Sequence, residues 1–107
     1  MQSYFAVIFS STMKSGITGY AEMAAKMEQL AKLQSGYLGI EAARDSEQGI
    51  TVSYWQDEAS IVSWKNEVEH TLARKMGREE WYQNYHVRVC RVEREYQFDS
   101  QDNDKDE

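Results

Sequence analysis

The sequence predicts an α+β domain of ferredoxin-like β-α-β-β-α-β order, in which a four-stranded antiparallel sheet carries both helices on one face. Two stretches place apolar residues at the i, i+3, i+4 spacing of an amphipathic helix, and four have the extended or alternating pattern of strands. The order of these six stretches along the chain is that of a split β-α-β unit. We therefore expect one sheet with a helical layer on a single side.

The first half of the chain contributes a strand and a helix. Residues Tyr4–Ser11 form a continuous aromatic and β-branched run, which suits a strand with both faces covered. After the break at Lys14-Ser15-Gly16, helix-spaced apolar residues predict the first helix: Tyr20, Met23, Ala24, Met27, Leu30 and Ala31. Ser35-Gly36 supplies the glycine that commonly ends a helix.

A hairpin and a second helix follow. Alternation over residues 37–42 and again over Ile50–Trp55 predicts two strands, joined by the polar turn Asp45–Gly49. Asp57 is placed to cap a helix that runs to Gly77. Its apolar face consists of Ile61, Trp64, Val68, Leu72 and Met76. We expect a short helical turn at Arg78–Tyr82 and a last strand over Tyr85–Phe98.

Two features predict a homodimer. The sheet face without helices would expose large apolar groups, either Phe5, Val7 and Phe9 or their neighbours, together with Trp55 or Tyr54. The last strand also changes phase, because Val87 and Val89 are apolar at odd positions whereas Val92, Tyr96 and Phe98 are apolar at even ones. A bulge near Cys90, or a strand that joins another chain's sheet, would produce this change. Both features favour a two-sheet barrel built by two copies.

Composition limits the other possibilities. The 107 residues fit one domain over 1–98, followed by an acidic tail over 99–107 that has no apolar residue to bury and is expected to be disordered. That tail carries about −4 of the net charge of −6, so no basic face for nucleic acid remains. A lone cysteine, no secretion signal and no long apolar run predict a cytoplasmic protein without a membrane span. We expect Cys90 to be a small residue of the core.

The chain resembles the antibiotic biosynthesis monooxygenase (ABM) family of dimeric α+β barrels, from Tyr4 to Phe98. The segments that carry the resemblance are Tyr4–Phe9, Gly36–Glu41, Ile50–Trp55, Ile61–Lys65 with Glu69-His70, and Gly77–Tyr82. The resemblance implies a homodimer and an activity without cofactor or metal, in which an electron-rich phenolic substrate itself reduces dioxygen in a dry pocket between sheet and helices. Such a pocket would stabilise the substrate anion and exclude water.

Candidate site residues follow from the same resemblance. His70, six residues after Trp64, matches the position of a polar aromatic partner in some family oxygenases, and its charge changes near neutral pH. We expect His70, Trp64 and Arg78 to be catalytic, with Arg78 meeting a substrate anion. The residues expected to line the substrate pocket are Tyr54, Trp55 and Tyr82. The structural alternatives are core packing for Trp64, a solvated imidazole for His70 and a helix-end contact for Arg78.

Two other functions remain open at the level of sequence. A non-catalytic homodimer that binds a small hydrophobic molecule, or acts as a scaffold, needs the same apolar cavity as an oxygenase. A haem-degrading branch of the family carries an asparagine on the first strand and a histidine about ten residues after the helix tryptophan. Here the first strand has no asparagine and the position ten after Trp64 is Arg74, so haem chemistry is disfavoured.

Overall fold

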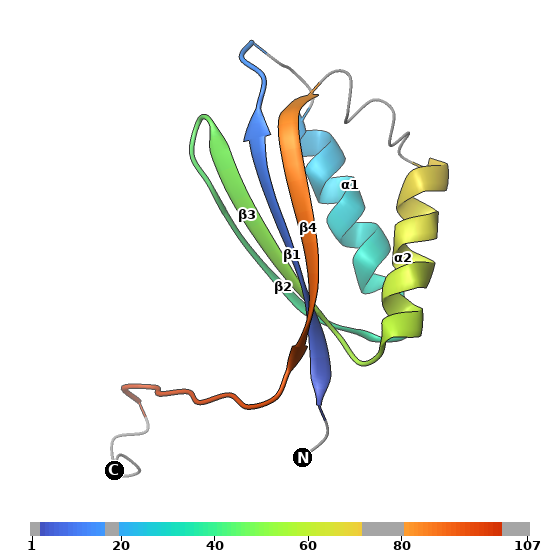
Figure 1. The fold of residues 1–107 in the computed structure, drawn as a ribbon, viewed down its shortest axis with the longest axis vertical. Helices are drawn as coiled ribbons and strands as arrows, with labels where there is room; N and C mark the ends of the chain where they lie inside the picture. The colour runs from blue at the N-terminus through green and yellow to red at the C-terminus, as the bar shows by residue number, and fades with distance from the viewer. Residues whose placement is uncertain (1–2, 17–19, 72–80, 102–107) are drawn as a thin grey trace.

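The computed structural model describes residues 3–16, 20–71 and 81–101. The elements in these ranges are β1 (Tyr4–Met13), α1 (Tyr20–Lys32), β2 (Tyr37–Arg44), β3 (Gln48–Trp55), α2 (Glu58–Thr71) and β4 (Tyr82–Val92). The strands form one antiparallel sheet in the order β2-β3-β1-β4, and both helices lie on one side of it (Figure 1). The predicted ferredoxin-like α+β fold is confirmed. Neither described helix is long and apolar enough to cross a membrane.

Odd-numbered residues of β1 face the helices. Val7 is buried in one cluster with Ala31 of α1, Trp55 of β3 and Ile61 of α2. Because side chains alternate along a strand, the even-numbered residues of β1 face the side that has no helices. We call these two sides of the sheet the helix side and the open side.

The register fixes which residues share the helix side. Phe5 pairs with Trp55 on β3 and with Arg91 on β4. The next rows along the sheet are Val7 with Ser53 and Val89, then Phe9 with Thr51 and Val87. On β2 the register shifts between Tyr37 and Gly39, an irregularity that the uninterrupted alternation of the sequence did not predict.

Asp57 caps α2, as its position before the helix predicted. Its Oδ1 accepts hydrogen bonds of 2.8 Å from both the backbone N–H and the hydroxyl of Ser60, and these bonds lower the pKa of the carboxyl below its usual 3.8. A lowered folded-state pKa adds stability above the unfolded pKa, and this stability is lost as the pH falls through the folded pKa.

We therefore expect Asp57→Ala to lower the melting temperature at neutral pH, and by progressively less as the pH falls below 3.8. Thermal unfolding followed by circular dichroism across this range measures the effect. Asp57→Asn is the control, because it keeps an oxygen acceptor without a titrating group. If the melting temperatures of wild type and Asp57→Ala differ by the same amount at every pH, the stabilising effect of the cap does not depend on ionisation of the Asp57 carboxyl.

Gly36 allows the first turn of α2 to approach the α1–β2 turn closely. The Gly36 carbonyl accepts a 2.8 Å hydrogen bond from the Gln56 N–H, and a Cβ at Gly36 would overlap the Ser60 hydroxyl and lie 2.5 Å from the Ser60 Cβ.

We expect Gly36→Ala to destabilise the fold by about 1–3 kcal/mol, the usual range for overpacking. Urea unfolding should show a smaller cost for Gly36→Ala in a Ser60→Gly background, and equal costs in both backgrounds would argue against the steric cause.

The C-terminal part differs from the sequence prediction. β4 begins at Tyr82, three residues earlier than expected, and ends at Val92 instead of Phe98. The pairing of β1 with β4 is regular past Cys90, and its shift lies between Thr12 and Met13, so no bulge near Cys90 causes the change of phase. Residues 93–101 instead leave the sheet as an extended segment (Figure 1).

The open side is only partly covered within one chain. Tyr4, Ile8 and Val52 are half-buried there, and Ile50 is 52% exposed. The sequence predicted that both faces of the first strand are covered. Within one chain, only its helix side is. Cys90, expected in the core, is exposed on the open side because its register partner is Ala6, an even-numbered residue of β1.

Candidate functional site

Trp55 and Trp64 form the centre of the helix side. Trp55 is fully buried, and its indole Nε1 donates a 2.8 Å hydrogen bond to the Ser53 hydroxyl two residues earlier on the same strand face. The Trp64 ring, carried by α2, stacks on the Trp55 ring with centroids 5.1 Å apart and an interplanar angle of 28°. Tyr37 meets Trp55 edge-on at 5.8 Å, and Phe5 packs against the same cluster.

The indole N–H of Trp64 differs from that of Trp55. It is buried, and the described residues place no acceptor within hydrogen-bond distance of it. A buried donor without a partner costs about 1–3 kcal/mol, and native proteins keep few of them. An unpaired donor at this position is suited to an oxygen atom of a bound molecule.

Among the described residues, the helix side of the sheet is least covered on the middle of β4. α1 packs mainly against β2 and α2 against β3, and the described helices reach β4 at its first residue, where Tyr20 of α1 contacts Tyr82. Val87 and Val89 point to the helix side yet are 46% and 50% exposed. We call Phe5, Val87, Val89 and Arg91 the helix-side strip. Val87 and Val89 give this strip an accessible apolar surface, whereas the two stacked indoles beside it are buried.

Arg91 ends this strip. Its guanidinium carbon lies 5.7 Å from the centre of the Phe5 ring, in cation–π geometry, and the side chain is exposed. Among the described residues, no carboxylate lies within ion-pair distance of it. Arg91 therefore places a positive charge beside an apolar surface.

A second aromatic cluster occupies the opposite end of the sheet. Trp81 and Tyr82 are buried there with Met13, and the Tyr82 hydroxyl donates a 3.2 Å hydrogen bond to the Tyr20 hydroxyl. Burial, followed by this hydrogen bond, raises the pKa of Tyr82 far above its usual value, so Tyr82 stays protonated and acts as a donor. The Arg44 guanidinium lies over the Tyr20 ring, 5.3 Å from its centre.

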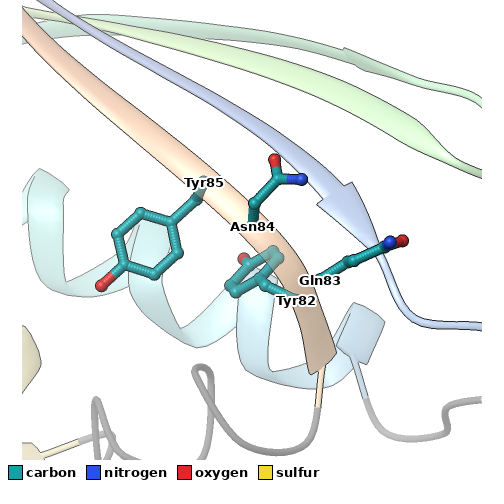
Figure 2. Close-up of a pocket in the computed structure, with 4 residues that line it drawn as sticks. All are labelled: Tyr82, Gln83, Asn84 and Tyr85. Carbon is teal, nitrogen blue, oxygen red and sulfur yellow. The ribbon is translucent and has the colours of Figure 1, made fainter.

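A shallow pocket of about 240 Å³ lies beside this cluster, at the start of β4, lined by Tyr82, Gln83, Asn84 and Tyr85. Figure 2 shows these four side chains splayed around the strand, with the Tyr85 ring and the Gln83 amide pointing away from each other. The Tyr85 ring stacks on Phe9 with centroids 5.3 Å apart. Polar groups that diverge in this way are poorly placed to grip one small molecule.

The structure brings some of the sequence-predicted site residues together and separates others. Trp64 and Trp55 are in contact, whereas Tyr82 belongs to the second cluster. Tyr54 lies on the open side, where its hydroxyl donates a 2.9 Å hydrogen bond to Glu41 and this bond raises the pKa of Tyr54. The side chain of His70, which lies within α2, and the whole of Arg78 fall outside the described residues. Their catalytic roles stay predictions.

Arg91 is the residue of this region that sequence reasoning did not single out. Its neighbours Arg88 and Arg94 made it one of several cations in a charged stretch. The only signal in the sequence is parity, because Arg91 follows Val87 and Val89 at period two and so shares their strand face.

Comparisons with known proteins place the chain among relatives. No protein-family model matches it. It is 45% identical over 102 residues to the uncharacterized protein YqjZ of Bacillus subtilis, which covers 94% of this chain and 90% of YqjZ. It is also 32% identical over 92 residues to jasmonate monooxygenase ABM of Pyricularia oryzae, where the match covers 82% of this chain but only 43% of that longer protein.

Solved structures show the same fold. SnoaB, a cofactor-independent oxygenase from Streptomyces nogalater, superimposes with a TM-score of 0.73 at 9% sequence identity, over 89% of this chain and 97% of SnoaB. A Bordetella bronchiseptica protein whose structure is described as that of a "putative antibiotic biosynthesis monooxygenase" gives a TM-score of 0.65 at 17% identity, over 83% of this chain and 96% of that one.

Proposed function

This chain belongs to the antibiotic biosynthesis monooxygenase family, and we propose that it is a monooxygenase that oxidises a small, largely apolar molecule on the helix side of its sheet. The observation that carries the proposal is the buried indole N–H of Trp64, which has no acceptor among the described residues. Trp64 is carried by α2 and stacks on Trp55, so a substrate that enters between α2 and the sheet has one directed hydrogen bond to receive.

The stacked indoles suit oxygen chemistry on an electron-rich ring. The indole N–H of Trp55 is hydrogen-bonded to the Ser53 hydroxyl. The indole N–H of Trp64 is therefore the one we propose to stabilise negative charge on a substrate oxygen. A donor in a water-poor site stabilises an anion more strongly than it does in water. Loss of a substrate proton would then raise the electron density that dioxygen accepts.

We propose that this reaction needs no cofactor, as the name of SnoaB states for that oxygenase. When a ring methylene becomes a carbonyl, the substrate carbon loses two hydrogens and four electrons. One oxygen atom of dioxygen enters the product, and the other leaves as water with those two hydrogens. The substrate thus supplies every electron, and the protein's tasks are to bind it, stabilise its anion and limit access of water.

The working unit that we propose is a homodimer joined through the open sides of two sheets. Each chain offers half-buried and exposed apolar residues there, including Ile8, Ile50 and Val52. The segment 93–101 leaves its own sheet with Tyr96 87% exposed and Phe98 77% exposed, which is a large apolar surface for water to cover. A second copy would bury both surfaces, since an isologous interface uses the same patch twice.

We expect Trp64→Phe to lower kcat/KM about tenfold, because phenylalanine keeps the aromatic packing and removes the hydrogen-bond donor. Oxygen uptake, first screened with anthrones and hydroxynaphthalenes, measures the effect. Trp81→Phe is the matched control, since it makes the same change in the second cluster. Equal rates for wild type and Trp64→Phe would remove the indole from the reaction. No oxygen uptake with any compound of the panel would favour the non-catalytic binding protein instead.

A further inference from the structure

The open side of the sheet carries opposite charges on its two edge strands. Glu41 on β2 and Arg88 on β4 lie in one row across the sheet, with Val52 and Ile8 between them. Both charged side chains are exposed, and among the described residues neither has an ion-pair partner in its own chain. The row therefore runs from an anion through two apolar residues to a cation.

Both charged side chains are already oriented on this side. Glu41 Oε1 accepts a 2.9 Å hydrogen bond from the Tyr54 hydroxyl, and Arg88 Nη2 lies 3.3 Å from Nδ1 of His86. Tyr54 and His86 both belong to the open side, since each pairs with an even-numbered residue of β1. Side chains that are oriented beforehand lose less conformational entropy when a partner binds.

The two middle strands differ in side-chain size on the open side. Tyr54 of β3 pairs with Ala6 of β1, and Ile50 of β3 pairs with Ser10 of β1. β3 therefore presents the larger side chain in both rows. Two such sheets interdigitate when β3 of one copy faces β1 of the other, whereas β3 facing β3 would set large side chains against each other.

A two-fold axis parallel to the strands, midway between β3 and β1, satisfies the size pattern and the charge pattern together. Rotation about this axis sets β3 over β1 and β2 over β4, and each row faces the same row of the other copy. Glu41 of each copy then faces Arg88 of the other, so the contact occurs twice. Packed sheets lie about 10 Å apart, which these two long side chains can bridge together.

A two-fold axis across the strands fails on the same two patterns. It would set β3 on β3 and β4 on β4. The open side of β4 consists of Asn84, His86, Arg88, Cys90 and Val92, so it has no carboxylate to meet an arginine. The charges therefore distinguish between the two ways of stacking the sheets.

We propose that the homodimer has its two-fold axis parallel to the strands and is aligned by two reciprocal ion pairs, each between Glu41 of one copy and Arg88 of the other. This arrangement rests on the homodimer of the proposed function and specifies which residues meet in it. Val52 of one copy packs on Ile8 of the other in the middle of the row. The charges at its ends select the alignment, because a sheet stacked the other way would cover both without pairing them.

Two charge reversals that fail alone and succeed together test the arrangement. Glu41→Arg sets arginine against arginine twice, and Arg88→Glu sets glutamate against glutamate twice. We expect each variant alone to have a dimer dissociation constant at least about a hundredfold above that of wild type, because like charges juxtaposed in an interface are strongly unfavourable. In an equimolar mixture, a heterodimer has two pairs of opposite charge, and we expect its constant to lie within about tenfold of wild type.

Sedimentation over a dilution series measures these constants, and circular dichroism checks that each variant is folded. The matched control is Arg91→Glu, which reverses the same charge on the helix side of the same strand and should leave the dimer unchanged. Association of the mixture but not of either variant alone supports the proposal.

Two kinds of failure are distinguishable. If wild type is a dimer and the single variants dimerise equally well, the mixed variants do not associate, or Arg91→Glu weakens the dimer as much, then the ion pairs and the axis are wrong while the proposed dimer stands. A monomeric wild type would overturn both this arrangement and the proposed homodimer.

Discussion

Trp55→Ala should destabilise the fold by about 3–5 kcal/mol, the range observed when a buried tryptophan or phenylalanine is truncated in a well-packed core. Trp55 is fully buried, and its ring contacts Tyr37 and Trp64, so truncation opens a cavity beneath α2. Domains of this size are stable by about 5–15 kcal/mol in total. Chemical unfolding at one fixed protein concentration measures the loss.

The control for this prediction is Trp55→Phe. It keeps an aromatic ring against Trp64 and removes the hydrogen bond to Ser53, so it isolates the polar part of the effect. We expect a smaller cost than for alanine, about 1–3 kcal/mol, because the Ser53 hydroxyl is left buried without its partner. A Trp55→Ala variant as stable as wild type would show that the cluster of Val7, Ala31 and Ile61 holds the sheet and helices together without it.

Ile50→Glu should prevent the proposed homodimer from forming. Ile50 is 52% exposed on the open side of a single chain, so a glutamate there costs the chain's own fold little. In a two-fold interface the substitution appears twice, and each copy would bury an unpaired carboxylate. We expect a weakening of dimerisation of at least a thousandfold, because a buried charge without a partner costs several kcal/mol.

Sedimentation measures this change directly, since one chain has a mass of 12.5 kDa. Val62→Glu is the matched control, because Val62 is 56% exposed on α2, in the helical layer on the other side of the sheet. Wild type and the control should sediment with twice the mass of one chain, and Ile50→Glu with the mass of one. If Ile50→Glu keeps the doubled mass, the open side is not the interface.

Element type was readable from the sequence because local patterns decide it. The helical spacing of Ala24, Leu30 and Ala31 and the cap at Asp57 predicted α1 and the start of α2, and alternation predicted the strands. The end of β4 was misplaced because Tyr96 and Phe98 continue a strand-like composition after the sheet has no further neighbour for them. The residue types of a strand do not show where the neighbouring strand that it pairs with ends.

The candidate site was only partly readable, for a related reason. Trp64 and Trp55 were recognisable as large aromatic residues, and the structure adds that they stack. Tyr54 and Trp55 were both expected to line the pocket, and the structure places them on opposite sides of the sheet, because neighbours on a strand alternate. Arg91 gained significance only when the register placed it beside Phe5, a contact between residues at opposite ends of the chain.

The pairing of β1 with β4 also determines the order in which this molecule can be completed during synthesis. β1 is the first strand to leave the ribosome and lies at the middle of the sheet, but one of its two neighbours is the last strand made. Until β4 emerges, one edge of β1 has no partner, and contacts between such distant segments are slow to form. The nascent chain therefore carries a prolonged risk of pairing β1 with another molecule, which gives chaperones a defined interval in which to act.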